Sequence, residues 1–556
     1  MVYLGGKNVE DGKKGRFWRY GSYMKPDEYG LHHEEWREHQ KDSVRWAMDS
    51  KIEKISILEA PTGSGKTAIA KAIGSKLRVI SLVQTKVLQV ENYEADYGFD
   101  VLFGRGNYEC VHPTAHKWTM ADECIFAEVG MNKCGVHSEC PYIIAREAAK
   151  QSSLASLNYP YWLHTYHKWP LPNVLVCDEG HELPEIVLDW AGCTVNNKTR
   201  LEFDLPMFPV IRTNPGQSIR MEVKNSQEKA YEWCNEALIV LRGKYAYFSN
   251  SASTNKEHRK ALRKVELLGK KILSTAEALQ IGSEGSWYIR SGPPQDGERS
   301  LSNWKFVCRP LTARYHFPLY FTGNYSTFIM SATIGNFDTF AAEIGADNFR
   351  SLCVPSVWPA STRPVYKLDV PGIGRKSTPA AWKKQAEEIA NAINMCDPSW
   401  SGIIHTNSIV EAGRLAERLA RLGLQDRIYV SERKPTNVMM DEWQRQLQNK
   451  PNSILVSWAF WQGYNGLDEK IDIVAKIPYP FLGDPYEKAR MMHDGKLFLQ
   501  RAAWKLEQGA GRTRRGRPED YDTDEGRAGM VAVADGNVTR VRNYLSAAMR
   551  ESLTEL

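Results

Sequence analysis

The feature that most constrains the fold of this chain is a glycine-rich turn placed between an apolar run and a helical pattern. Residues Ile55 to Leu58 are β-prone, and the turn that follows reads Ala60-Pro61-Thr62-Gly63-Ser64-Gly65-Lys66-Thr67. Residues Ala68 to Leu77 then have the apolar spacing of a helix. A strand, a glycine-rich turn and a helix in this order begin a βαβ unit, which predicts a parallel sheet of the α/β class.

This turn fits the phosphate-binding loop, except that Ala60 stands where the pattern has its first glycine. The backbone N–H groups of such a loop and the following helix N-terminus cradle phosphates. Lys66 adds a cation near the β- and γ-phosphates, and the Thr67 hydroxyl is a ligand for Mg²⁺. We therefore predict a site for a nucleoside triphosphate with magnesium at Gly63, Ser64, Gly65, Lys66 and Thr67. The alternative is a glycine turn without a ligand.

The same alternation of apolar runs and helical segments continues along most of the 556 residues. Further parallel strands are expected at Val79–Val83, Val174–Cys177, Thr327–Met330, Gly402–His405, Ile454–Ser457 and Ile473–Ile477. Residues 200–310 differ, because Glu228–Leu241 and Glu257–Leu279 have the spacing of long amphipathic helices. The chain therefore predicts two α/β lobes and an inserted, mostly helical domain, with a hinge at the Pro/Ser cluster Pro355–Pro364.

Two further segments carry groups that suit nucleotide hydrolysis. An apolar run ends in two adjacent carboxylates, Asp178 and Glu179. At the end of a strand, Asp178 can hold the metal through water and Glu179 can polarise the attacking water. Gln508, Arg512 and Arg515 share one short segment, and arginines aimed at a γ-phosphate stabilise the charge of the transition state. A solvated turn and a basic surface helix are the respective alternatives.

Four of the ten cysteines gather in one stretch, at Cys110, Cys124, Cys134 and Cys140. Ten cysteines are too few for a disulfide scaffold in a chain of this length. Four thiolates are the ligand set of a [4Fe–4S] cluster. Structural zinc sites usually bring their cysteines in pairs about two to four residues apart, and this stretch has no such pair. The spacing favours iron–sulfur over zinc, and unliganded core cysteines are the third alternative.

The net charge of +6 does not by itself indicate a nucleic-acid partner, because the local distribution of charge matters more than the sum. Between Thr254 and Lys271 the basic residues are Lys256, Arg259, Lys260, Arg263, Lys264, Lys270 and Lys271. Most of them fall on one side of a helix, where they either neutralise phosphates or form a solvated surface. Aromatic residues near polar turns are candidates for stacking on bases, namely Tyr108, Trp118, Trp287, Tyr288, Trp304 and Trp461.

Taken in order, these segments resemble the superfamily 2 helicases, and within them the iron–sulfur DNA helicases of the XPD/DinG type. The glycine-rich turn resembles motif I, and Asp178-Glu179-Gly180-His181 resembles the DEAH box, with glycine in place of the usual alanine. The remaining matches are Arg37–Gln40 with the entry motif, Thr85–Gln89 with motif Ia, Ser331–Thr333 with motif III, Gly463–Asp468 with motif V, and Gln508–Arg515 with motif VI. One departure is Asn465, where the family usually has glutamate.

Two segments separate this family from other helicases. Gly104–Cys110 resembles the family's entry into its cluster domain, and Cys140–Tyr142 with Ala145 and Arg146 resembles the exit. The resemblance implies that Arg37, Gln40 and Asp468 contribute to the ATP site. It also implies that the four cysteines hold a [4Fe–4S] cluster beside the point of strand separation.

The resemblance implies a fold of two RecA-like parallel-sheet lobes with an iron–sulfur insert and a helical arch insert. The expected parts are an irregular N-terminal arm at 1–33, a first lobe at 34–100, 151–199 and 311–355, the cluster insert at 101–150, the arch at 200–310 and a second lobe at 356–556.

The implied function is an ATP-dependent DNA helicase that travels 5′→3′ on single-stranded DNA and unwinds forked DNA, with ATP, Mg²⁺ and the cluster as cofactors. We expect a monomer inside the cell, cytoplasmic or nucleoid-associated. The first residues form no secretory signal, and no apolar stretch reaches the roughly 18 residues of a membrane span. The alternatives are a DExH-type RNA helicase, a single-strand translocase that does not unwind, and a non-catalytic, metal-stabilised nucleic-acid-binding protein.

Overall fold

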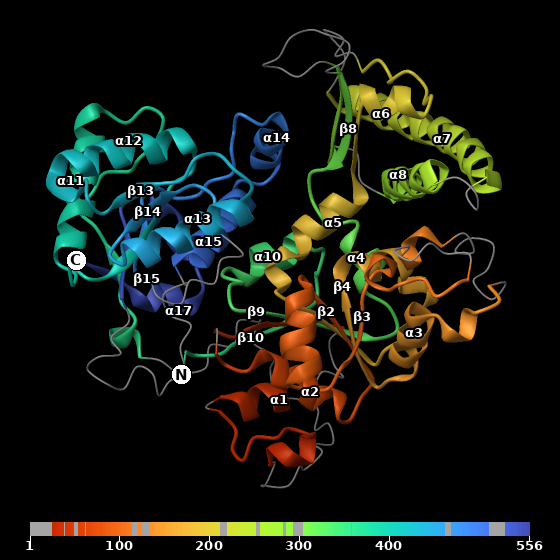
Figure 1. Ribbon diagram of the computed structural model, residues 1–556, viewed down its shortest axis with the longest axis horizontal. Helices are drawn as coiled ribbons and strands as arrows, with labels where there is room; N and C mark the ends of the chain where they lie inside the picture. Colours follow the sequence, from red (N-terminus) through yellow and green to blue (C-terminus); the bar gives the residue numbers. More distant parts are fainter. Residues whose placement is uncertain are drawn as a thin grey trace.

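The computed structural model describes most of the chain and shows two lobes side by side, with a third body beside the first lobe (Figure 1). The described residues are 25–37, 39–48, 54–61, 63–113, 120–124, 134–211, 219–251, 256–281, 285–292, 304–356, 359–461, 469–510 and 529–556. None of the helices within these ranges is both long enough and apolar enough to cross a membrane.

The first lobe is built on a seven-stranded, all-parallel sheet with the order β10-β1-β9-β5-β2-β4-β3. Its strands are β1 (Ile55–Glu59), β2 (Val79–Val83), β3 (Asp100–Leu102), β4 (Leu154–Asn158), β5 (Val174–Asp178), β9 (Ser326–Ser331) and β10 (Arg350–Cys353). Every residue of β1, β2 and β5 is buried, because helices cover both faces of a parallel sheet. These helices are α1 (Gln40–Met48), α2 (Lys66–Gly74), α3 (Pro141–Gln151), α4 (Tyr159–Thr165), α5 (Leu183–Ala191), α9 (Phe317–Phe321) and α10 (Phe337–Glu343).

The second lobe repeats this architecture with seven parallel strands in the order β13-β14-β12-β15-β16-β11-β17. The strands are β11 (Val365–Lys367), β12 (Ser401–His405), β13 (Ile428–Val430), β14 (Ile454–Ser457), β15 (Glu469–Val474), β16 (Met530–Val533) and β17 (Leu553–Glu555). Its helices are α11 (Pro379–Asn394), α12 (Ile409–Leu419), α13 (Thr436–Asn449), α14 (Pro485–His493), α15 (Gly495–Ala510), α16 (Val538–Val541) and α17 (Ala547–Ser552). The two predicted RecA-like lobes are confirmed. Strand β15 begins earlier than expected, at Glu469, and it ends at Val474, before Pro478 and Pro480, which lack the N–H that a ladder hydrogen bond needs.

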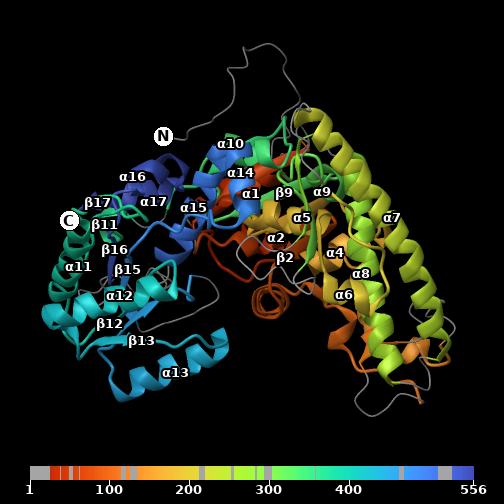
Figure 2. The same ribbon diagram turned by 90° about the horizontal axis from the view of Figure 1, so that it is seen from above.

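The third body, which we call the arch, joins two long helices to a small sheet. Helices α7 (Ile219–Ser251) and α8 (Lys256–Ile281) run beside each other along one side of the first lobe (Figure 2). At their base, β6 (Cys193–Asn196), β8 (Lys305–Pro310) and β7 (Trp287–Gly292) form an antiparallel sheet. The short helix α6 (Asn197–Glu202) directly follows β6 in the chain. Trp233 of α7 packs on Phe306 of β8 with ring centroids 4.6 Å apart. The sequence analysis predicted the two helices but not this sheet.

The described part of the segment between β3 and α3 contains one isolated β-bridge, Glu109 with Met120, and short 3₁₀ turns at η3 (Arg105–Asn107), η4 (Ala121–Glu123) and η6 (His137–Glu139). We call this segment the insert. It is tied to helix α8 of the arch by ion pairs from Arg105 to Glu266 at 3.0 Å and from Arg263 to Asp122. The insert and the arch therefore meet on one side of the first lobe.

The two lobes touch through buried polar contacts of α15 and the C-terminal segment. Trp504 Nε1 of α15 donates to the carbonyl oxygen of Ile334 at 3.0 Å. Gly335 has a φ of 76°, and a Cβ there would lie 2.0 Å from the carbonyl oxygen of Tyr544, so only glycine allows this approach. The backbone N–H of Ala547 donates to Glu59 at 3.0 Å. Glu59 directly precedes the glycine-rich turn, so the second lobe contacts the first beside the candidate nucleotide site.

Candidate nucleotide site, cysteine cavity and arch cavities

The glycine-rich turn has the geometry of a phosphate-binding loop. Gly63 and Gly65 have φ values of 85° and 79°, which glycine adopts without strain, and Gly65 caps helix α2, whose first residue is Lys66. Lys66 Nζ donates to the carbonyl oxygen of Ala60 at 3.2 Å. The Ser64 hydroxyl is buried and has no hydrogen-bond partner among the described residues. A buried, unpaired hydroxyl beside a lysine and a helix N-terminus fits a phosphate group.

Two residues of the entry motif hold this loop from the start of α1. Arg37 Nη1 donates to the carbonyl oxygen of Gly63 at 2.5 Å, and Gln40 Nε2 donates to that of Gly65 at 3.4 Å. A Cβ on residue 65 would lie 2.3 Å from Gln40 Nε2, so the glycine is required for this contact as well as for its φ. The structure thus brings Arg37 and Gln40, both predicted for the ATP site, onto the backbone of the loop.

The two predicted carboxylates stand at the end of the neighbouring strand β5. Asp178 is buried, and its Oδ2 accepts a hydrogen bond from the Tyr93 hydroxyl at 2.9 Å. Burial, together with the adjacent Glu179 carboxylate, raises the pKa of Asp178 to about 6, although the positive charge of Lys66 acts to lower it. Glu179 has a φ of 50°, a left-handed conformation that is uncommon for a residue with a side chain and is found at sites where strain serves a function. Lys66, Asp178 and Glu179 therefore belong to one site.

A chain of hydrogen bonds connects these carboxylates to the second lobe. Gln508 Nε2, in the last turn of α15, donates to His181 Nε2 at 2.6 Å. With Nε2 accepting, the proton of the imidazole lies on Nδ1, which faces the Ser331 hydroxyl at 2.8 Å and Glu179 Oε2 at 3.4 Å. The Ser331 hydroxyl in turn lies 3.5 Å from Glu179 Oε2. Residues of three motifs therefore meet beside the phosphate loop. One of them, Gln508, follows Lys66 by more than 400 positions.

Some predicted site residues cannot be compared with the geometry. Asp468, Arg512 and Arg515 lie outside the described residues, as does Asn465. Thr67 is the second residue of α2 and is half-buried. The residues that the sequence analysis did not select for the site are Tyr93 and His181, although His181 was part of the DEAH match. For Tyr93 the sequence holds no signal, because tertiary packing alone brings it to Asp178.

The four clustered cysteines line one cavity of the insert. Cys110, Cys124, Cys134 and Cys140 are all half-buried and form no disulfide, and they share the cavity with His112 and His137. Within the described ranges, no group of three or more His, Cys, Asp or Glu side chains is close enough to hold a single metal ion. Four thiols around one cavity match the donor set of a [4Fe–4S] cluster, so the residues present fit that group.

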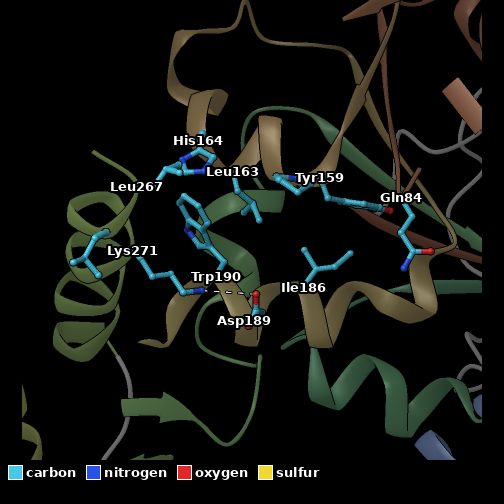
Figure 3. Close-up of a pocket in the computed structure, with 11 residues that line it drawn as sticks. Gln84, Tyr159, Leu163, His164, Ile186, Asp189, Trp190, Leu267 and Lys271 are labelled. Atoms are coloured by element: carbon cyan, nitrogen blue, oxygen red, sulfur yellow. Dashed lines mark ion pairs between the residues drawn. The ribbon is translucent and has the colours of Figure 1, made fainter. Parts of the chain in front are cut away.

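Two larger cavities separate the first lobe from the arch. The first, the arch cavity, has a volume of about 610 Å³ and lies between α4, α5 and α8. Figure 3 shows its lining, with Lys271 of α8 extending toward Asp189 of α5, where Nζ and Oδ2 are 3.8 Å apart. In the same wall His164 and Trp190 meet edge to face at 4.6 Å. Burial lowers the pKa of His164 to about 4, so this imidazole is neutral at physiological pH.

The second, the basic cavity, has a volume of about 640 Å³ and lies between the insert, α4 and α8. Its basic lining residues are Lys86, Arg105, Arg263 and Lys270, and its polar lining includes Asn107 and Asn158. The two cavities share Pro160, His164 and Leu267, so they adjoin each other. The basic cavity is also lined by Asp122 and Glu266, which pair with Arg263, Arg105 and Lys270, while Lys86 and the aromatic and apolar groups of both cavities suit the phosphates and bases of a single strand.

One prediction about nucleic-acid contacts is wrong, and the other, for the basic face of α8, keeps both of its alternatives. Trp287 and Trp461 are buried in the cores of the arch and the second lobe, with exposed fractions of 6% and 3%, so neither is available for stacking. The basic face of α8 is largely engaged in ion pairs with acidic residues from distant parts of the chain. These pairs are Lys264 with Glu202, Lys271 with Asp189 and Arg263 with Asp122. Trp118 lies outside the described residues.

Comparisons with known proteins agree with this arrangement at the level of the fold. No protein-family model matches the chain, and no curated protein matches it. The solved structure titled "XPD_APO" is similar with a TM-score of 0.52 and 15% identity, over 89% of this chain and 95% of that chain. The structure titled "XPD_Helicase" is similar with a TM-score of 0.50 and 14% identity, over the same shares of both chains. This chain has the fold of the XPD helicases. At such low identity the comparisons show a shared fold, and the function of this chain has to be argued from its site.

Proposed function

We propose that this protein is an ATP-dependent DNA helicase of the XPD type, which moves 5′→3′ along single-stranded DNA and unwinds forked duplexes. The observation that carries the proposal is the contact between Gln508 of the second lobe and His181 of the first, beside Lys66, Asp178 and Glu179. A nucleotide held by groups from both lobes changes their separation when it is hydrolysed, and that motion moves a bound strand.

Each residue of the site has a task in hydrolysis. The loop at Gly63 to Gly65 binds the phosphates through its backbone N–H groups, with Lys66 neutralising the β- and γ-phosphates. Thr67 and Asp178 would hold Mg²⁺, which neutralises the charge that develops on the phosphates when it is bound. Glu179 orients the attacking water and accepts its proton. Arg512 and Arg515 are proposed to stabilise the γ-phosphate from the second lobe, and Asp468 to contact the nucleotide.

We further propose that the single strand passes between the first lobe and the arch, through the arch cavity and the basic cavity. Lys86, Arg105 and Lys270 would contact its phosphates, and Trp190 its bases. The choice of DNA over RNA rests on the resemblance of the cysteine segment and its flanks to the DNA helicases of this type.

The four cysteines are proposed to hold a [4Fe–4S] cluster. When bound, the cluster supplies folding free energy to a segment that has little regular secondary structure in its described part. Cys110, Cys124, Cys134 and Cys140 would then fix the insert against the arch, where it acts as a wedge at the fork. The proposed protein works as a monomer inside the cell.

The test compares ATP hydrolysis and strand separation by the wild type and by Lys66→Ala, on forked DNA and on the matching forked RNA. We expect single-stranded DNA to stimulate hydrolysis, forked DNA with a 5′ tail to be unwound, and Lys66→Ala to lose both activities. Unwinding of RNA in preference to DNA would indicate a DExH-type RNA helicase. Stimulated hydrolysis without unwinding would indicate a translocase. Hydrolysis that single strands do not stimulate would contradict the proposed motor.

A further inference from the structure

The segment between strand β2 and strand β3 contacts two separate features of the first lobe. Gln84 lines the arch cavity and Lys86 lines the basic cavity. The chain then forms a π-helix, η2 (Leu88–Ala95), from which the hydroxyl of Tyr93 reaches Asp178 Oδ2. One short segment therefore contacts the proposed path of the nucleic acid at one end and the proposed metal-binding carboxylate at the other.

The packing of η2 fixes where the Tyr93 hydroxyl lies. The side chain of Tyr93 is fully buried, and its ring meets Phe99 edge to face at 5.0 Å. Gln89, also fully buried, donates from Nε2 to the carbonyl oxygens of Ser156 at 3.1 Å and Leu102 at 3.4 Å, which anchors η2 to β4 and β3. The wide turns of π-helices are rare and occur mostly at functional sites. A movement of η2 is therefore transmitted to the hydroxyl without a free rotamer in between.

The carboxylate of Asp178 depends on this hydroxyl for its orientation. Its Oδ1 accepts from the backbone N–H of Glu179 at 3.0 Å, and its Oδ2 accepts from Tyr93. A second buried tyrosine, Tyr159, donates to the backbone carbonyl oxygen of Asp178 at 2.6 Å rather than to its carboxylate. Hydrogen bonds to an ionised, buried carboxylate are among the stronger ones in proteins. Tyr93 thus holds one oxygen of the carboxylate, and Tyr159 holds the backbone of the same residue.

We propose that Tyr93 is a positioning residue, which orients the Asp178 carboxylate toward the magnesium–nucleotide complex and makes that orientation respond to a strand bound at Gln84 and Lys86. This inference rests on the proposed ATP-dependent function. Outer-shell partners of metal-binding side chains typically change metal affinity by about 10–100-fold when they are removed. Filling of the arch and basic cavities would move the start of η2, and the hydroxyl of Tyr93 would carry that shift to the carboxylate.

The test uses Tyr93→Phe. The matched control is Tyr159→Phe, which also removes a buried hydroxyl that donates a hydrogen bond to Asp178. The first readout is the affinity for a fluorescent ADP analogue in Mg²⁺ and in EDTA. The second is the ratio of ATP hydrolysis with and without single-stranded DNA. For Tyr93→Phe we expect the affinity in Mg²⁺ to fall about tenfold, the affinity in EDTA to stay at the wild-type value, and the stimulation ratio to drop. For Tyr159→Phe we expect wild-type values in all three.

Two results would overturn the proposal. One is a Tyr93→Phe variant that keeps both the Mg²⁺-dependent gain in affinity and the stimulation by DNA. The other is an equal loss in Tyr159→Phe, which would mean that general packing around Asp178 is what matters. Equal nucleotide binding by wild type and Lys66→Ala is a different outcome, because it would contradict the proposed function itself and remove this inference with it.

Discussion

The glycine at position 180, where similar helicases usually have alanine, allows a sharp test of the packing around the DEAH-like segment. A Cβ at Gly180 would lie 2.2 Å from Cγ2 of Ile329, whose side chain is fully buried on the adjacent strand β9. Overpacking of this kind costs about 1–3 kcal/mol, from which the lower entropy of the unfolded alanine chain subtracts about 0.4–1 kcal/mol. We therefore expect Gly180→Ala to destabilise the protein by about 1–2 kcal/mol.

The cause of this effect can be isolated with a double-mutant cycle measured by urea unfolding and tryptophan fluorescence. Ile329→Ala alone should cost about 2–5 kcal/mol, because it leaves a cavity. Since that cavity accepts the new methyl group, Gly180→Ala should cost nothing in the Ile329→Ala background. Gly413 of α12 is the control, since a Cβ there meets no atom within 4 Å and Gly413→Ala should stabilise its helix. A Gly180→Ala variant as stable as the wild type, or an equal loss in both backgrounds, would refute this reasoning.

Three further predictions follow from the lobe contacts and the insert. Arg490→Ala should destabilise the protein by about 3–5 kcal/mol in urea unfolding, because the Arg490 side chain is 2% exposed and pairs with Glu185 of the first lobe at 2.8 Å. The control Lys488→Ala, at an exposed residue, should change the free energy of unfolding little. Burial raises the pKa of Glu507 to about 8. The contribution of the protonated Glu507 to stability is therefore complete below the usual glutamate pKa and is lost as the pH rises toward 8. Glu507→Gln should match the wild-type melting temperature near pH 5 and exceed it near pH 8.5, and a constant difference across this range would contradict the assignment. Cys124→Ser should lower the iron and acid-labile sulfide of anaerobically purified protein to background, and it should impair unwinding more than ATP hydrolysis. The control Cys396→Ser, in the second lobe, should leave the iron content unchanged. Zinc in place of iron would contradict the proposed [4Fe–4S] cluster.

Half of the strands of the two sheets, namely β1, β2, β5, β9, β12, β14 and β15, could be predicted from the sequence, because a buried parallel strand is a mostly apolar run. Val79–Val83 and Ile454–Ser457 are such runs, and the structure gives them the predicted bounds. The phosphate loop was equally clear, since its glycines and Lys66 are adjacent in sequence and local geometry determines their arrangement. These elements depend on neighbours in the chain, which is the information that one sequence supplies.

The features that could not be predicted depend on residues far apart in the chain. The arch sheet joins β6 to β8 across more than 100 positions, and both strands mix polar with apolar residues, so neither forms a continuous apolar run. The basic face of α8 suggested a surface for phosphates, but its lysines and arginines meet acids such as Glu202 and Asp122 that only the fold brings near. The hydrogen bond from Tyr93 to Asp178 is of the same kind, because 85 positions separate the two residues.

The measurement that tests the central claim most directly is the rate of ATP hydrolysis by Arg515→Ala at saturating single-stranded DNA. If groups from both lobes act on one triphosphate, this rate should fall by roughly 10³-fold or more while magnesium-dependent binding of ADP is retained. Hydrolysis at the wild-type rate would contradict the account, because the second lobe would then contribute no charge to the reaction.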